Sequence, residues 1–348
     1  MTSRGRRHPA VDRTRAPQTA TIGALSAERP HPSVELSVVV PVYGCAGCLA
    51  ELHRRLGASL EEITDNYELV FVDDRGPDDA WSVLEALGQQ DPRVRALRLA
   101  RNFGQHAAIT AGLAATRGRW VVVMDCDLQD PPEAIHRLYA AAQDGYDVVF
   151  GRRQTRAAPG WRRSSARAYF RLLNTFTGSS LEGSYGTFSI LNSQVVDAFL
   201  RVRDRDRHYL LILQWLGFEH TAVDYDHAAR HLGDSSYSPV TLLRHALNGL
   251  LFQTTVLLRF IVYAGFLLSA LGAALATYFV VAKLTGSAYP GWTSLAVFTL
   301  TIGGFTIIST GVTGLYVGKV FEQVKQRPLY VIDRTLESDR SQERDLAR

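Results

Sequence analysis

The sequence predicts an α/β fold with a mostly parallel sheet, followed by a hairpin of two transmembrane helices. Short valine-rich strands alternate with helical segments over residues 34–228, which is the pattern of strand–helix–strand units. Several of these strands end in acidic or polar residues. Two uncharged apolar runs, at 260–282 and 293–318, are each long enough to cross a bilayer. These three observations together predict a ligand-binding sheet attached to a membrane.

The composition excludes one large class of function. The chain has 348 residues, and 38 Lys and Arg against 34 Asp and Glu give a net charge of +4. No basic stripe interleaved with stacking aromatic residues is present in the globular part, so a nucleic-acid partner is not indicated. Residues 1–33 are rich in Arg, Pro, Thr and Ala without an apolar run, which predicts a disordered arm.

The first three strands are expected at 36–44, 68–72 and 94–99, each followed by a helix. The turn after the first strand lacks the G-x-G-x-x-G fingerprint, which argues against a dinucleotide-binding fold. The second strand ends in acid, and Asp78 or Asp79 is suited to cap the helix that begins near Trp81.

The fourth strand carries the strongest functional signal. Trp120 and three valines form a buried strand that ends in Asp125, Asp127 and Asp130. Carboxylates so close together repel each other unless a cation or a donor network lies between them. Pro131 then starts a helix, so the acids lie on a loop at the carboxyl edge of the sheet, where α/β folds bind ligands. We expect a divalent metal there; the alternative is a capped turn with solvated acids.

A further strand at 147–151 ends in two arginines, and the pattern then changes. Arg163, Arg167 and Arg171 recur every four residues and share one face of a predicted helix over 162–177. Such a helix can lie in the bilayer interface and attract anionic head groups. The alternative is the solvated face of an ordinary surface helix.

The two apolar runs predict the topology of the chain in the membrane. Basic residues lie on the sides away from the loop that joins the runs, which predicts that the domain at 34–228 and both chain ends face the cytoplasm. Residues 229–258 are expected to be an amphipathic juxtamembrane segment, and 319–348 a cytoplasmic tail. The alternative is that the runs are two buried core helices. A homo-oligomer is also compatible with the sequence.

Three cysteines, Cys45, Cys48 and Cys126, are too few for a disulfide scaffold. The Cys45–Cys48 pair has the spacing of a redox motif, but a zinc site would need two further ligands nearby. We interpret the spacing as incidental and expect all three to be reduced in a cytoplasm-facing domain.

A metal-binding domain attached to membrane spans can bring a water-soluble molecule to a lipid-soluble one. Magnesium binds one or two protein carboxylates together with substrate phosphates. A metal held by Asp125 or Asp127 can therefore bind a nucleotide diphosphate and neutralise its charge as a leaving group.

Several sequence blocks also carry a family resemblance. They are VVVPVYG, FVDD, NFGQHAAITAGL, MDCDLQDPPE, Gly151-Arg152 with Arg156, and the string from Arg230 to Ser238, followed by the two apolar runs. Over about 36–333 the chain resembles the family 2 glycosyltransferases of the GT-A fold, and more narrowly the polyprenyl-phosphate glycosyltransferases. The resemblance implies inverting transfer of a sugar from a nucleotide diphosphate sugar to a polyprenyl phosphate, with Mg²⁺ or Mn²⁺, at the cytoplasmic face of the cell membrane.

The resemblance also implies roles for residues at the ends of the strands. The metal is held by Asp125, Asp127 and Gln129. The nucleotide base and ribose contact Asp73, with Asp74 as either a second contact or a simple turn residue. The donor-binding residues implied are Pro41, Tyr43, Asp73, Asp74, Gln105, Asp125 and Gln129.

Arginines are the implied ligands of the donor and acceptor phosphates, because a planar guanidinium matches phosphate oxygens. The catalytic residues so implied are Asp127, Arg152 and Arg230. Arg156 is either a phosphate ligand or a surface residue. The residues of the acceptor site and of a loop closing over it are Arg156, Arg163, Arg167, Ser235 and Tyr237.

Three departures from the family pattern qualify these expectations. Gly44-Cys45 stands where relatives commonly have Asn-Glu, and Ser236 stands in place of a lysine. Ser184 replaces an aspartate that is a candidate base. A lipid phosphate is already anionic at neutral pH and needs no base, unlike a sugar hydroxyl. The alternatives are transfer to a lipid-linked glycan hydroxyl and a catalytically silent membrane partner.

Overall fold

The computed structural model describes residues 32–154, 185–205, 207–226, 256–285 and 291–337. Contacts divide the chain into two compact units, which we describe separately. The first comprises 1–156, 184–233 and 327–348, and the second 157–183 and 234–326. The predicted arm, save for residues 32 and 33, and nearly all of the predicted amphipathic segment lie outside the described residues.

An eight-stranded sheet forms the first unit, in the order β7-β5-β6-β4-β1-β2-β3-β8. Strands β4, β1, β2 and β3 are parallel neighbours, whereas β6 and β8 run antiparallel to the strands beside them. The mostly parallel sheet is therefore confirmed. The strands are β1 Val34–Val42, β2 Tyr67–Asp73, β3 Val94–Leu99, β4 Gly118–Val123, β5 Val148–Gln154, β6 Tyr185–Asn192, β7 His220–Asp226 and β8 Ile332–Leu336.

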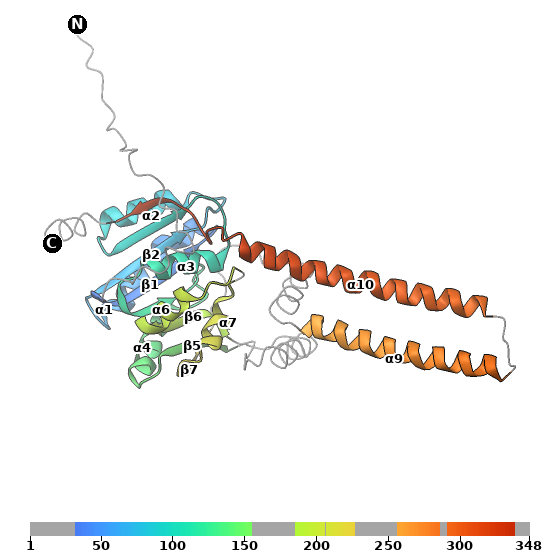
Figure 1. The fold of residues 1–348 in the computed structure, drawn as a ribbon. Helices are drawn as coiled ribbons and strands as arrows, with labels where there is room; N and C mark the ends of the chain where they lie inside the picture. Colours follow the sequence, from blue (N-terminus) through green and yellow to red (C-terminus); the bar gives the residue numbers. More distant parts are fainter. Residues whose placement is uncertain (1–31, 155–184, 206, 227–255, 286–290, 338–348) are drawn as a thin grey trace, which may run out of the picture. The chain divides into compact units, whose positions relative to one another are not determined.

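Helices cover both faces of the sheet (Figure 1). Successive side chains of a strand point to opposite faces, so Val38 and Val40 pack with α1, α2 and α4, while Val39 packs with α3, α6 and α7. This two-sided burial explains why the central strands read as continuous apolar runs. The helices are α1 Ala46–Glu61, α2 Ala80–Gln90, α3 Gln105–Ala115, the 3₁₀ turn η2 Pro132–Ala134, α4 Ile135–Gln143, α6 Ser193–Arg201 and α7 Tyr209–Leu216.

The register of the parallel strands brings their carboxyl ends to one edge of the sheet. Val42, the last residue of β1, pairs with Asp73, the last residue of β2. On the other side of β1, Val39 pairs with Val123 at the end of β4. The loops after β1, β2 and β4 therefore start side by side, and they carry most of the predicted site residues.

One helix cap differs from the prediction. Asp79 is at the N-cap position of α2 but makes no capping hydrogen bond with its side chain. Asp78 instead accepts a hydrogen bond from Ala46 N, the first residue of α1, at 2.6 Å. The turn after β2 thus caps the helix that follows β1, because the two loops are neighbours at the sheet edge.

The C-terminal segment completes the sheet. β8 pairs antiparallel with β3, and a Cβ placed on Gly88 of α2 would lie 2.4 Å from Leu336 Cδ2. Tyr330 is buried with Leu97 and Leu99. The sequence predicts only a cytoplasmic tail here, and the structure places residues 332–336 of that tail in the sheet of the first unit.

The second unit contains two long helices, α9 Val256–Leu284 and α10 Trp292–Val324. They pack antiparallel, with Gly265 beside Phe305 and Gly272 beside Phe298. By length and composition, Thr301–Val324 qualifies among the described residues to cross a membrane, and Phe260–Leu275 is a shorter apolar stretch. Helices are therefore present at both apolar runs, while a hairpin in which both helices cross the membrane stays a prediction.

The prediction of three reduced cysteines is wrong for two of them. Cys45 and Cys126 form a disulfide across 81 residues of sequence, and Cys48 is free and buried. The spacing of Cys45 and Cys48 gave no sign of this pairing. It arises because β1 and β4 are adjacent in the sheet, so the loops that follow them meet.

Candidate active site

The loop at 124–130, which follows β4, forms the centre of the candidate site. Asp125 Oδ1 accepts hydrogen bonds from Gln105 Nε2 at 2.7 Å and from Thr187 Oγ1 at 2.9 Å. Gln105 is the first residue of α3, and Thr187 belongs to β6, the antiparallel neighbour of β4. Two elements far apart in sequence therefore fix the position of this carboxylate.

Asp127 and Gln129 lie on the same loop, where the backbone turns sharply. Gln129 N donates a hydrogen bond to Asp127 Oδ1 at 3.2 Å. Between them Leu128 has a φ of 62°, in the left-handed region, and is buried. That conformation costs a non-glycine residue on the order of 1 kcal/mol and persists only where the surroundings impose it. The turn brings the three predicted metal ligands onto one short segment.

Negative charge accumulates around this loop. Burial, with the charges of Asp130 and Asp127, raises the pKa of Asp125 to about 6. Asp130 is fully buried; Tyr225 Oη donates a hydrogen bond to it at 2.5 Å, and Arg153 Nη2 lies 3.6 Å from the same oxygen. A raised pKa means that an ionised Asp125 is destabilised in this environment, and a bound cation would relieve that cost.

The side chains on this loop are of the types that bind a divalent metal together with a substrate, and a metal site here stays a prediction. Among the described residues, no group of three or more His, Cys, Asp or Glu side chains could hold a metal ion. Two carboxylates and one amide oxygen instead match Mg²⁺ or Mn²⁺, which would complete their shells with phosphate oxygens. When bound, such an ion would supply charge neutralisation to a departing diphosphate.

Asp73 and Asp74 lie at the same edge but have different partners. Asp73 accepts a hydrogen bond from Arg75 N at 3.0 Å and lies 3.5 Å from Arg98 Nε. The two carboxylate oxygens of Asp74 accept from Phe103 N at 2.7 Å and Gly104 N at 2.8 Å. Burial raises the pKa of both groups. Asp74 thus holds the turn that leads into α3 and, with it, Gln105.

The predicted contacts of the donor base lie on the β1 side of this edge. Tyr43 is 56% exposed, which leaves its ring accessible to a flat ligand. Pro41 is buried within β1 beside Val72 of β2. Their binding roles stay predictions, and Tyr43 is the one with a face open to solvent.

The two arginines at the end of β5 point to opposite faces of the sheet. Arg152 pairs with Asp224 of β7 through Nε at 2.5 Å and Nη2 at 3.1 Å. Arg153 lies on the acidic loop's side, and its Nε donates to Tyr225 Oη at 3.1 Å. The sequence prediction selected Arg152 as the phosphate ligand, and that role stays a prediction.

Sequence reasoning missed three residues that surround the acidic loop. They come from β5, β6 and β7, and the strand order that brings them together is not visible in the sequence. A period of two along β5 was the only available signal for one of them. The missed residues are Thr187, Arg153 and Tyr225, whereas Asp130 was seen as part of the acidic cluster without a predicted site role.

Several predicted site residues lie outside the described part of the chain. The structure therefore says nothing of their position, and their roles stay predictions. They are Arg156, Arg163, Arg167, Arg230, Ser235 and Tyr237, together with the departures Ser184 and Ser236.

The acidic loop lies at the carboxyl edge of a mostly parallel sheet, which is where α/β folds bind their ligands. Comparison with known families shows that residues 37–200 match the model of glycosyl transferase family 2. Relatives at least 30% identical extend this match over most of the chain. The protein belongs to glycosyl transferase family 2 and is a glycosyltransferase.

Two individual relatives are similar to the chain over most of their length. The chain is 33% identical over 304 residues to the uncharacterized glycosyltransferase YkcC of Bacillus subtilis, covering 87% of this chain and 94% of the relative. It is 34% identical over 315 residues to the undecaprenyl-phosphate 4-deoxy-4-formamido-L-arabinose transferase of Pseudomonas syringae pv. syringae, covering 89% and 93%.

Solved structures are less similar to the chain than these relatives are. One is glucosyl-3-phosphoglycerate synthase from Mycobacterium tuberculosis in complex with Mn²⁺, UDP-glucose and phosphoglyceric acid. It is 20% identical with a TM-score of 0.45, covering 67% of this chain and 84% of that chain. An overlap of this quality supports no further conclusion about the site.

Proposed function

We propose that this glycosyltransferase moves one sugar, with inversion, from a nucleotide diphosphate sugar to a polyprenyl phosphate at the cytoplasmic face of the cell membrane. The acidic loop carries the proposal. Asp125 and Asp127 would hold a divalent metal together with the donor diphosphate, with Gln129 as a third ligand. Arg152, Arg156 and Arg230 would bind phosphate groups of the donor or acceptor.

The choice of acceptor rests on chemistry and on the relatives. A lipid monophosphate is an anion at neutral pH and can attack the anomeric carbon without a general base. Direct attack by the phosphate oxygen displaces the diphosphate in one step, and one displacement inverts the configuration. The presence of Ser184, where a base is expected in the family, is compatible with this acceptor. The relative from P. syringae is named for transfer to undecaprenyl phosphate.

The membrane assignment rests on the second unit. Large apolar side chains of α9 and α10 are exposed, including Tyr263 at 70%, Phe266 at 72% and Ile307 at 74%. Exposed apolar surface of this extent marks a binding or membrane surface. Lipid chains would cover it, and the basic residues at the outer ends of the apolar runs favour a cytoplasmic location for the catalytic unit.

The test is a transfer assay with the membrane-embedded protein. Undecaprenyl phosphate, Mg²⁺ or Mn²⁺, and a panel of labelled UDP-, GDP- and dTDP-sugars are supplied to wild type and Asp127→Ala. We expect lipid-extractable label that mild acid releases, reduced at least about a hundredfold in Asp127→Ala because a metal ligand is lost. Asp144→Ala, an exposed aspartate at the end of α4, is the matched control and retains activity.

The outcomes separate the alternatives. Label that resists mild acid would indicate a glycan hydroxyl as acceptor. Nucleotide binding without any labelled lipid would indicate a silent partner. The anomeric configuration of the product, determined by NMR and compared with that of the donor, tests inversion.

A further inference from the structure

A disulfide lies within the machinery of the candidate site. Cys126 is the residue between Asp125 and Asp127, and Cys45 follows the β1 strand and precedes α1. Both cysteines belong to the same core cluster as Met124 and Leu128. The bond therefore ties the segment that carries both acidic side chains directly to the start of α1.

The geometry of the acidic loop depends on such restraints. Leu128 holds a left-handed backbone conformation that a non-glycine residue adopts only where its surroundings impose it. Hydrogen bonds from Gln105 and Thr187 hold Asp125, which is next to Cys126. The disulfide is the covalent restraint in the middle of the loop. Breaking it allows residues 124–130 to adopt more conformations. A smaller fraction of the molecules then has the carboxylates of Asp125 and Asp127 placed to bind a cation.

We propose that Cys45–Cys126 is a redox modification site, at which a dithiol reductant cleaves the disulfide and thereby weakens divalent cation binding at Asp125 and Asp127. The cation part and the cytosolic setting rest on the proposed function; the thiol exchange itself does not. Disulfides in proteins that face the cytosol are usually transient and catalytic or redox-sensing. A bond between two site loops, rather than between remote surface segments, gives such a change a direct effect on binding.

The exchange starts at Cys45. Cys45 is itself buried, but Gly44 before it and Gly47 two residues after it are exposed, whereas the carboxylates of Asp125 and Asp127 would repel a thiolate that approached Cys126. The reductant thiolate forms a bond with Cys45 Sγ, the Cys45–Cys126 bond breaks, and the electron pair leaves on Cys126 Sγ, which takes a proton. The second thiol of the reductant then attacks the reductant's own sulfur in the mixed disulfide. Cys45 is released as a thiol, and the reductant leaves as a disulfide.

The reduced protein is expected to stay folded. The reaction transfers two electrons and two protons to the protein, and each released thiol is a small apolar group in a packed cluster. Cys48 lies in the first turn of α1, three residues after Cys45, and is already a buried free thiol of this kind. It provides the matched control, because Cys48→Ala removes a neighbouring thiol and leaves the disulfide intact.

The experiment compares the full-length oxidised protein in detergent with the same protein after dithiothreitol and desalting. Alkylation and mass spectrometry count the free thiols, which should rise from one to three. Hydrogen exchange of the 124–130 amides should become faster on reduction. Binding of Mn²⁺ alone, followed by the electron paramagnetic resonance of the free ion, should weaken about tenfold and recover on reoxidation.

Variants make the outcome decisive. Cys45→Ser and Cys126→Ser should bind Mn²⁺ as weakly as the reduced wild type and ignore dithiothreitol, whereas Cys48→Ala should respond like wild type. Equal hydrogen exchange of the 124–130 amides and equal Mn²⁺ affinity in the two redox states overturn the proposal. So does a purified protein in which all three cysteines are already free thiols before dithiothreitol is added. Faster exchange on reduction without Mn²⁺ binding in either state supports the redox site and contradicts the proposed cation site.

Discussion

At the scale of single residues, the candidate site is held together by buried polar contacts around the acidic loop. Asp130 is fully buried between Tyr225 of β7 and Arg153 of β5. A Cβ on Gly186 would lie 2.9 Å from Arg153 Nη2, so this guanidinium has little space in which to move. Asp130 comes directly after Gln129, and its contacts therefore fix the end of the predicted metal-binding loop.

Tyr225→Phe tests this role. The substitution keeps the ring and removes the hydroxyl that donates to Asp130 and accepts from Arg153. We expect the free energy of unfolding to fall by about 1–3 kcal/mol, because a buried carboxylate loses a hydrogen-bond partner. We also expect Mn²⁺ binding to weaken. Tyr139→Phe is the matched control, because Tyr139 Oη donates to Glu35 at 3.0 Å, away from the loop. Equal effects of the two changes on Mn²⁺ affinity would contradict a positioning role.

At the scale of elements, α3 connects the core to the site. Its first residue, Gln105, contacts Asp125, and its middle packs so closely on the sheet that a Cβ on Gly112 would lie 2.4 Å from Val39 Cγ1 and 3.1 Å from Val72 Cγ2. Glycine is therefore required by the approach of the helix to β1 and β2. The close approach sets where the first turn of α3 ends up relative to the acidic loop.

Gly112→Ala should destabilise the protein by about 1–3 kcal/mol through overpacking, although alanine favours an isolated helix by about 1 kcal/mol. Gly57→Ala in α1 is the control, because a Cβ there meets only Tyr67 Oη at 3.6 Å. Denaturant unfolding should show opposite signs for the two variants. Stabilisation by both would mean that α3 can move away from the sheet at no cost.

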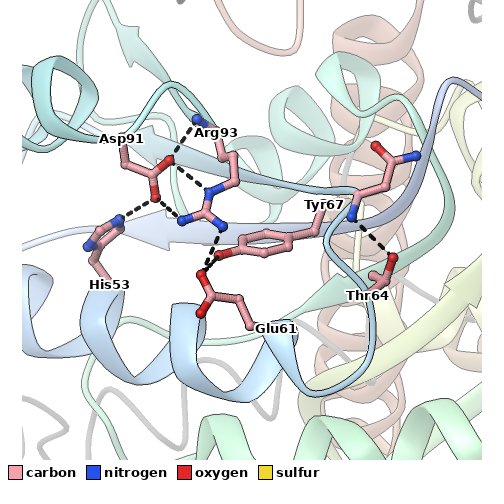
Figure 2. A network of polar contacts seen from close by, with 7 residues as sticks. His53, Glu61, Thr64, Tyr67, Asp91 and Arg93 are labelled. Atoms are coloured by element: carbon pink, nitrogen blue, oxygen red, sulfur yellow. Dashed lines mark hydrogen bonds and ion pairs between the residues drawn. The ribbon is translucent and has the colours of Figure 1, made fainter.

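A second set of contacts between elements lies where β2 and β3 begin (Figure 2). Asp91, after α2, accepts hydrogen bonds from His53 of α1 at 3.0 Å and from Arg93, whose Nη1 also donates to Glu61 at 3.0 Å. Arg93 Cζ lies 4.5 Å from the centre of the Tyr67 ring. These contacts join α1, α2 and the starts of β2 and β3.

This network predicts a pH dependence of stability. Burial opposes the ionisation of Asp91, but hydrogen bonds from Arg93 and His53 outweigh it and hold the pKa below its ordinary value. The folded protein thus favours the ionised form, so the stabilisation is present above about pH 4 and is lost as the pH falls through the lowered pKa. Asp91→Asn should lower the free energy of unfolding by about 1–3 kcal/mol at pH 7. It should also flatten the acid side of a curve of stability against pH. A curve parallel to that of wild type would contradict the assignment.

At the scale of the whole molecule, the catalytic unit is not continuous in sequence. β8 follows the two long helices and pairs with β3, and Arg95 of β3 contacts both Glu68 at 2.9 Å and Glu337 at 3.2 Å. The sheet is therefore completed only when the last part of the chain has been made. Both ends of the inserted helical segment are attached to the same unit.

Removing residues 327–348 should destabilise the catalytic unit. β3 becomes an open edge, and the apolar contacts of Tyr330, Ile332 and Leu336 are lost. A cost of at least about 2 kcal/mol corresponds to a fall in Tm of about 4–8 °C for a unit of this size. Removing only 338–348 is the control, because it keeps all of β8, and it should lower Tm less. Identical thermal unfolding of both truncations would show that β8 contributes nothing to stability.

The sequence by itself determined the alternation of strands and helices, the two apolar helices and the acidic loop after β4. Valine runs, a side-chain period of two and clustered carboxylates are local signals, and they need no knowledge of the strand order. Asp125, Asp127 and Gln129 could therefore be selected from the motif alone. Departures such as Cys45 were visible but had no evident partner.

Only the tertiary structure decided which residues meet across the sheet. The pairing of β6 with β4 brings Thr187 to Asp125, the pairing of β5 with β7 places Arg153 and Tyr225 beside Asp130, and β8 returns to β3. The Cys45–Cys126 bond depends in the same way on β1 lying next to β4. Such contacts follow from strand order and register, which are set by the packing of the whole core rather than by any local stretch of sequence.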